Sequence, residues 1–175
     1  MTKPFFVAVS VLIATWLPAR LDAKAPTVKV IINGHNEFAP IEITDPAIRN
    51  FHVWAGVGAR RNGVEEASGF IIDWAWGPVV EVPQGLPQFQ VSFYTGPEQP
   101  DADFSATAEP KLSYVVVYAY DAGAGQGYVY IPGHREPWYE VNTRSILRNV
   151  EGKWFRASSE WQRFVTPVLS RRRWQ

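Results

Sequence analysis

The sequence predicts a mainly β protein: a single β-sandwich-like domain or one strongly bent antiparallel sheet, accompanied by two short helices. Short runs of β-branched and aromatic residues recur along the chain and are separated by glycine and proline. Eight tryptophans and fourteen prolines occur among 175 residues, whereas long patterns of helical periodicity are few. The clearest strand signal is Leu112–Pro132 (LSYVVVYAYDAGAGQGYVYIP), which predicts a hairpin around a glycine-rich turn.

Residues 1–23 have the features of a signal peptide. Lys3 precedes the apolar run Pro4–Leu17, and small residues favour cleavage after Ala23. A retained membrane anchor is the alternative, but the run is shorter than the roughly 20 residues of a bilayer span. We therefore predict export to the periplasm or the extracellular space, with no stable membrane span after cleavage.

Charge and cysteine content limit the function classes. The chain has 17 Lys+Arg and 17 Asp+Glu, and cleavage removes Lys3, Arg20 and Asp22, which leaves 15 against 16 and a net charge of −1. A nearly neutral domain has no general attraction for nucleic acid. Without cysteine, the chain forms no disulfide, carries no lipoprotein anchor and uses no thiol nucleophile. Residues 24–170 suit one β-rich domain, and 171–175 form a basic tail.

Several elements are predicted before the hairpin. Asp45 is a good helix N-cap and Pro46 a good first helical residue, so a short helix is expected from Pro46 to about Phe51. A long exposed acidic loop is expected at 95–110. The predicted strands in this half of the chain are 27–32, 41–43, 69–76, 79–82 and 89–94.

The hairpin residues alternate between two apolar faces, so both faces should be covered. One face of its first strand carries Tyr114, Val116 and Tyr118, and the other carries Val115 and Ala119. We expect the small aliphatic face in the main core and the tyrosine face under loops or a helix.

Beyond the hairpin, we expect a strand at 138–142 and a second hairpin that pairs 143–149 with 153–156. A last helix follows, capped by Ser158 or by Ser159 in an S-x-x-Q capping box with Gln162. Pro167 should limit the regular part of this helix.

The chain has no strong catalytic or cofactor motif. Gly123–Gly127 resembles a phosphate loop, but a strand follows it where such a loop requires a helix. Two H-x-E pairs, His35–Glu37 and His134–Glu136, have metal-ligand types but lie in predicted loops, so no metal and no cofactor is expected. Ser68 and Ser113 stand in no nucleophile motif.

Two aspartates leave an enzymatic alternative open. Asp73 and Asp121 stand in or beside aromatic strands, where a raised carboxyl pKa would suit acid catalysis of glycoside hydrolysis. The competing interpretation gives Asp121 a turn role and makes Asp73 an outward or hydrogen-bonded polar residue. Their separation decides the case.

Exposed aromatics next to loops are the favoured binding residues. Tryptophan and tyrosine combine a flat apolar area with a polar group, which suits ligand contact. Most aromatics of this chain should fill the core, and Trp76, Trp138 and Tyr139 are the best surface candidates because they adjoin glycine or proline.

Two stretches, Ile43–Ala47 (ITDPA) and Gly125–Gly133 (GQGYVYIPG), resemble uncharacterised exported bacterial proteins. The resemblance implies no activity and transfers no functional residue. The sequence therefore predicts an exported bacterial protein, a non-catalytic domain that binds a ligand or protein partner or belongs structurally to the envelope. The alternative is an extracytoplasmic hydrolase acting on glycans through paired carboxylates.

Overall fold

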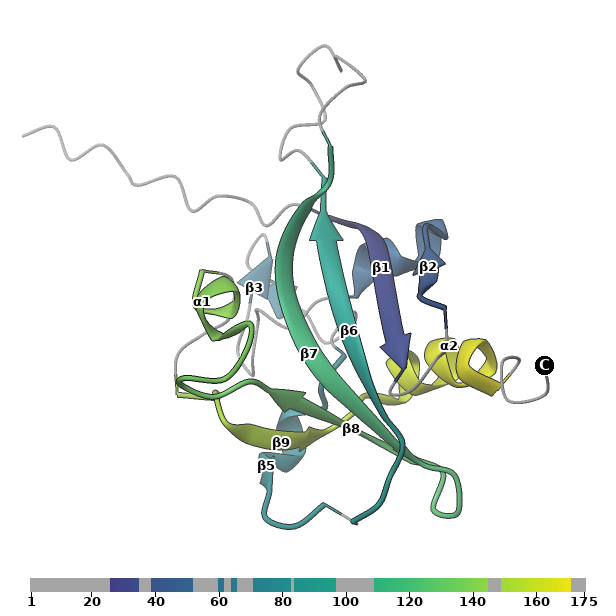
Figure 1. Ribbon diagram of the computed structural model, residues 1–175, viewed down its shortest axis with the longest axis vertical. Helices are drawn as coiled ribbons and strands as arrows, with labels where there is room; N and C mark the ends of the chain where they lie inside the picture. Colours follow the sequence, from purple (N-terminus) through teal and green to yellow (C-terminus); the bar gives the residue numbers. More distant parts are fainter. Residues whose placement is uncertain are drawn as a thin grey trace, which may run out of the picture.

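The computed structural model describes residues 26–34, 39–51, 60–61, 64–65, 71–82, 84–96, 109–144 and 149–170. The fold is mainly β, as predicted: seven antiparallel strands form one unclosed sheet in the order β2-β1-β6-β7-β8-β9-β5 (Figure 1). The bent-sheet alternative is therefore the observed one. The strands of this sheet are β1 (Thr27–Gly34), β2 (Ile41–Ile43), β5 (Pro78–Val79), β6 (Gln88–Thr95), β7 (Lys111–Asp121), β8 (Gln126–Ile131) and β9 (Lys153–Arg156).

Short elements complete the described part of the chain. The pair β3 (Arg60–Arg61) and β4 (Val64–Glu65) forms a separate two-stranded sheet. The helical elements are η1 (Pro46–Asn50), η2 (Trp74–Trp76), α1 (Tyr139–Asn142) and α2 (Ser159–Ser170). No helix within the described ranges has the length and apolar character needed to cross a bilayer. The predicted signal peptide and basic tail lie outside those ranges.

The predicted central hairpin is confirmed as β7 and β8. Its turn is held by the Asp121 carboxylate, which accepts from the amides of Gly123 (2.9 Å) and Ala124 (3.0 Å). β7 is longer than β8, and β8 pairs only with the second half of β7, from Val117 onwards. Figure 1 shows β8 and β9 swinging away from the first half of β7, with α1 beside the part that they leave.

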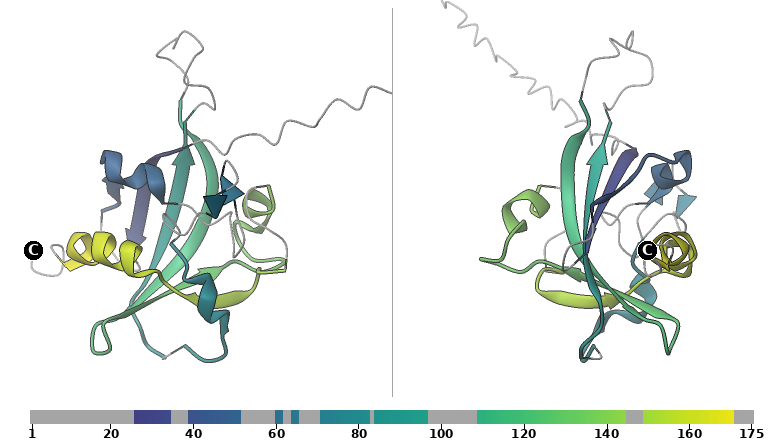
Figure 2. Two further views of the ribbon diagram at one scale, coloured as in Figure 1. Left: turned by 180° about the vertical axis from the view of Figure 1, so that it is seen from behind. Right: turned by 45° about the vertical axis from the view of Figure 1, so that its right-hand side comes forward.

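The two faces of the sheet carry different helices, with α2 on one side and α1 on the other (Figure 2). The main core lies under α2, where Trp161 and Val165 are fully buried against Tyr114 and Tyr118. The prediction of a small aliphatic face in the main core is therefore wrong, because the core cluster contains Tyr114 and Tyr118 but not Val115, which alternates to the other face. Trp161 supplies the large apolar partner that makes the tyrosine face the inner one.

Gly127 makes room for this packing. An added Cβ would lie only 2.7 Å from Cε2 and 2.8 Å from Cζ of Tyr118, so the fully buried phenol ring lies directly over the glycine. The same glycine fixes the start of α2, because its N–H donates to the Gln162 side chain (2.9 Å). Its carbonyl accepts from Ala157 N (2.8 Å), which ties the hairpin to the residues that lead into the helix.

Helix caps were partly predictable. Asp45 caps η1 by accepting from Ala47 N (2.8 Å), as expected. Ser158 caps α2 by accepting from Trp161 N (3.1 Å), whereas the capping box at Ser159 is not formed because Gln162 bonds elsewhere. Pro167 does not end α2, which continues to Ser170. Pro167 has no N–H to donate to the carbonyl of Arg163, four residues earlier. Both residues are exposed, so water can bond to that carbonyl instead.

Four other strand predictions differ from the structure. Within the predicted strand 69–76, residues 71–76 form one bridge at Ile72 followed by η2, because the Asp73 carboxylate caps that turn. Residues 139–142 form α1, and β9 pairs with β8 and β5 rather than with the segment 143–149. The return strand predicted at 79–82 shrinks to Pro78–Val79.

Candidate binding surface

The face of the sheet that carries α1 also carries a set of aromatic side chains. Cross-strand pairing places Gln90, Val117, Tyr130 and Trp154 in one row across β6, β7, β8 and β9. The next row brings Tyr128 opposite Arg156 on the same face, since both positions are displaced by two residues. We use the name aromatic surface for six side chains on this side of the sheet. They are Tyr128, Tyr130, Trp154 and Arg156 from the two rows, together with the nearby Trp76 and Trp138.

Neighbouring side chains on this surface contact one another. The rings of Tyr130 and Trp154 have centroids 5.0 Å apart and an interplanar angle of 36°. The Arg156 guanidinium lies 4.2 Å from the centroid of the Trp76 ring, a cation–π geometry. Tyr130, Trp154 and Arg156 are half-exposed, and Trp76 is 65% exposed. The strands therefore hold a group of flat side chains that solvent reaches.

A turn after β8 fixes the hydroxyl of Tyr130. This hydroxyl donates to the Glu136 carboxylate, whose two oxygens each lie 2.9 Å away, and Glu136 also accepts from Gly133 N (2.7 Å). Burial, together with the hydrogen bond and the negative charge of Glu136, raises the pKa of Tyr130 to about 12. The phenol consequently stays neutral near physiological pH, and its ring is held in a fixed orientation.

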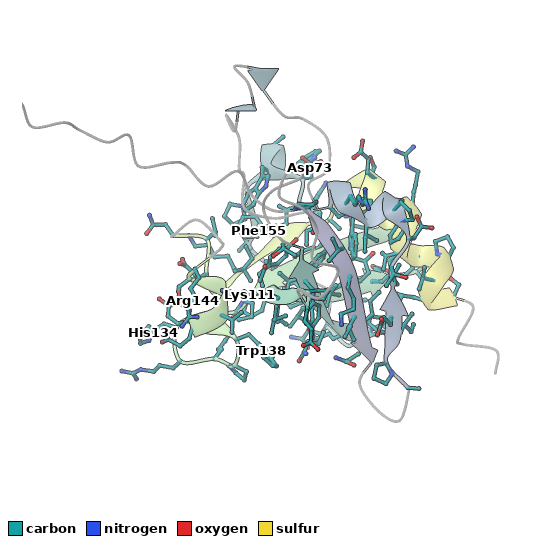
Figure 3. All side chains as sticks on the ribbon, turned by 90° about the horizontal axis from the view of Figure 1, so that it is seen from above. Asp73, Lys111, His134, Trp138, Arg144 and Phe155 are labelled. Atoms are coloured by element: carbon teal, nitrogen blue, oxygen red, sulfur yellow. The ribbon has the colours of Figure 1, made fainter. Side chains whose placement is uncertain are left out.

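Trp138 ends the same turn in an unusual backbone conformation. Its φ of 72° lies in the left-handed region, which costs roughly 1–2 kcal/mol for a residue with a Cβ. The indole N–H donates to Gln90 Oε1 (3.1 Å), so the strained residue is tied to the sheet, and 40% of it remains exposed. Figure 3 shows Trp138 and His134 on the α1 side, away from α2. Backbone strain at an exposed aromatic residue is typical of a binding site.

The three predicted binding residues have different positions. Trp76 and Trp138 are exposed, as expected, and both belong to the aromatic surface: Trp76 contacts Arg156, and Trp138 donates to Gln90. Tyr139 is half-buried and packs against the His134 ring, with centroids 5.1 Å apart. Tyr139 therefore contributes to the turn and not to the row of rings.

Tyr130 and Trp154, at the centre of the surface, were not among the predicted binding residues. Tyr128 and Tyr130 alternate with the buried Val129 and Ile131, and this alternation was the available signal for a half-exposed tyrosine face on β8. Trp154 was assigned to the wrong hairpin, so its position beside Tyr130 was not expected. Only the pairing of β8 with β9 brings the two rings together.

Neither aspartate of the hydrolase hypothesis is free of a local structural role. Asp73 accepts from Ala75 N (3.2 Å), and Asp121 accepts from two amides of its own turn. These bonds agree with the turn interpretation, and no observation supports paired catalysis.

The other candidate groups also have local partners. Within the described ranges, no cluster of three or more His, Asp and Glu could hold a metal ion. The Ser113 hydroxyl is hydrogen-bonded to Thr95 Oγ1 (2.5 Å). His35, Glu37 and Ser68 lie outside the described residues.

Comparison with known proteins gives no relative for this chain: no family model, no curated protein and no solved structure matches it.

Proposed function

We propose that this chain is an exported bacterial, non-catalytic binding domain and that the aromatic surface is its ligand-binding site. The observation that carries the proposal is the half-exposed pair Tyr130–Trp154, with exposed tryptophans near it on the same side of the sheet. Export rests on the predicted signal peptide at residues 1–23.

The chemistry of the surface favours a ligand with flat apolar faces and hydroxyl groups, which is the chemistry of a glycan. Binding is favourable when the apolar face of a ligand covers an aromatic ring, because apolar area of both is removed from water. Gln90 and Glu136 place hydrogen-bonding atoms next to the rings, and such groups give a binding site its orientation and specificity. Because the rings project from paired strands, little backbone entropy is lost on binding.

A binding screen tests the proposal. Mature protein (residues 24–175) is titrated with neutral and acidic oligosaccharides while thermal unfolding and tryptophan fluorescence are followed. A specific ligand at about 100 times its Kd stabilises the fold by about 2.7 kcal/mol. We expect Trp154→Ala to abolish that shift and Arg163→Ala, on the exposed side of α2, to keep it. A panel without any shift, or a shift that Trp154→Ala leaves intact, contradicts the proposal.

Export is tested separately by cell fractionation. The full chain should appear in the periplasm or the medium, and deletion of residues 2–23 should retain it in the cytoplasm. Recovery of both forms in the cytoplasm would remove the exported part of the proposal and leave the binding surface to be judged by the screen.

A further inference from the structure

Arg156 is a half-exposed cation without a carboxylate partner in the described part of the chain. Its guanidinium carbon lies 4.2 Å from the centroid of the Trp76 ring. The residue lies in β9 between two core-facing positions, Phe155 and Ala157, so its side chain points to the same face as Trp154. A positive charge is therefore presented at one end of the aromatic surface.

The contact with Trp76 positions the Arg156 guanidinium, which suits binding of a planar anion. An arginine fork binds a carboxylate through two parallel hydrogen bonds, and the contact with the Trp76 ring limits where the guanidinium can lie. Arg156 already has its aromatic contact, and among the described residues no carboxylate pairs with its guanidinium, so its N–H groups can donate to a ligand. A carboxylate is the complementary group for this position.

We propose that the aromatic surface binds an acidic polysaccharide, with Arg156 pairing with a uronic acid carboxylate while Trp154 and Trp76 contact the sugar rings. This inference rests on the proposed function and names its ligand class. Tyr130 and Trp138 continue the surface towards β6, where Trp138 bonds to Gln90. Three strand spacings separate β6 from β9, which corresponds to roughly 14 Å and suits an extended chain of several sugar units.

The test compares one glycan in two charge states. Alginate oligosaccharides are used beside the same oligosaccharides after reduction of their carboxylates to primary alcohols, and binding to the mature protein is measured by calorimetry. We expect the acidic form to bind at least roughly tenfold more tightly, a preference that declines with salt. Polygalacturonate and hyaluronate, each with its reduced form, extend the comparison to other uronic acids.

Two charge-removing variants on the same strand localise the effect. Arg156→Gln should bind the acidic and the reduced form equally, because the positive charge that distinguishes the two forms is removed, whereas loss of the Trp76 contact affects both forms alike. Lys153→Gln should behave as wild type, because Lys153 alternates to the other face of β9 and its ammonium bonds to Asn149 O (2.8 Å). Unfolding temperatures of both variants verify that the fold is retained.

Equal binding of the charged and reduced forms, or an unchanged preference in Arg156→Gln, overturns the inference. So does failure of all three acidic glycans to bind, or equal binding of a poly-glutamate peptide. In each case, a neutral glycan that binds and loses its effect in Trp154→Ala still supports the proposed function, so the two failures are distinguishable.

Discussion

Tyr118 and Tyr130 lie on adjacent strands of one hairpin, yet they occupy opposite environments. Tyr118 is fully buried and meets the Trp161 ring edge-on, at 6.2 Å and 88°. Tyr130 is half-exposed, contacts Trp154 and donates its hydroxyl to Glu136. The same residue type therefore serves the core on one face and the proposed binding surface on the other, because α2 covers only the first face.

The indole groups show the same contrast. Trp161, under α2, is completely buried, and within the described residues its N–H has no hydrogen-bond partner. Trp138, on the α1 side, is 40% exposed and donates to Gln90. An unpaired buried donor costs about 1–3 kcal/mol, which the packing around Trp161 must exceed. The α2 face thus depends on packing, whereas the α1 face retains satisfied polar groups.

The largest expected effect compares two tryptophans on opposite faces. Trp161→Ala should lower the free energy of unfolding by about 3–5 kcal/mol, because it leaves a cavity among Phe51, Phe93 and Tyr118. Trp154→Ala should lower it by about 1 kcal/mol, since mainly the contact with Tyr130 is lost. Denaturant unfolding followed by circular dichroism measures both. If Trp161→Ala does not fold, Trp161→Phe should still lower the free energy of unfolding by more than Trp154→Ala does. Equal losses of unfolding free energy on the two faces would contradict the prediction.

A second substitution tests the close packing of the buried face. Gly127→Ala should destabilise the protein by roughly 1–3 kcal/mol, because the new Cβ overlaps the Tyr118 ring, which has no room to move. Gly123→Ala in the turn of the same hairpin is the control, with an expected change within about 0.5 kcal/mol. Its new Cβ would meet only the Asp121 carboxylate, at 3.3 Å. A neutral Gly127→Ala would show that the α2 face is loosely packed.

The third prediction concerns Asn142, a buried polar residue at the end of α1. Asn142 pairs its side-chain amide with both backbone groups of Val115, accepting from N (2.8 Å) and donating to O (2.7 Å). Asn142→Ala leaves these groups unpaired and should cost about 1–3 kcal/mol in unfolding experiments. Thr143→Ala, which removes one exposed bond to Glu140 O, should cost less than about 0.5 kcal/mol. Similar losses in the two variants would mean that water replaces the Asn142 amide.

The smallest effect is a titration on the exposed face. The folded state holds the Tyr130 proton more tightly than the unfolded chain, whose tyrosine pKa is near 10.0. Stability from this group is therefore fully present below pH 10 and is lost as the pH rises from 10 towards 12. Glu136→Gln should lower the pKa of Tyr130, measured from its Cζ resonance by NMR, because a negative charge is removed. Glu140→Gln should leave that pKa unchanged; an equal response to both would exclude the direct bond as the cause.

Much of the fold could be predicted from local patterns. Alternation and turn chemistry identified β1, β2, β6 and the central hairpin, and cap chemistry identified η1. The errors share a cause: they concern segments whose state depends on partners distant in sequence. Asn142 adopts α1 because its amide has a strand edge to bond 27 residues away, and Trp154 pairs with β8 instead of with its sequence neighbours.

Of the candidate site, only the two exposed tryptophans, Trp76 and Trp138, could be predicted from the sequence. Trp76 and Trp138 adjoin glycine or proline, which made their exposure an inference from local sequence. Tyr130 and Trp154 lie in strands, where sequence alternation predicts two faces but cannot tell which one a helix will cover. The choice is made by α2, whose apolar side needs the Tyr118 face for its own burial.

The amide of Asn142 also has a consequence for the edge of the sheet. It occupies the edge of β7 at Val115, just before the position from which β8 takes over the pairing. An unprotected stretch of strand edge at this point would be a template on which a second copy of the chain could add a strand. The Asn142 side chain, carried by a helix of one turn, already occupies both backbone groups of Val115, so these two groups are not available to such a strand.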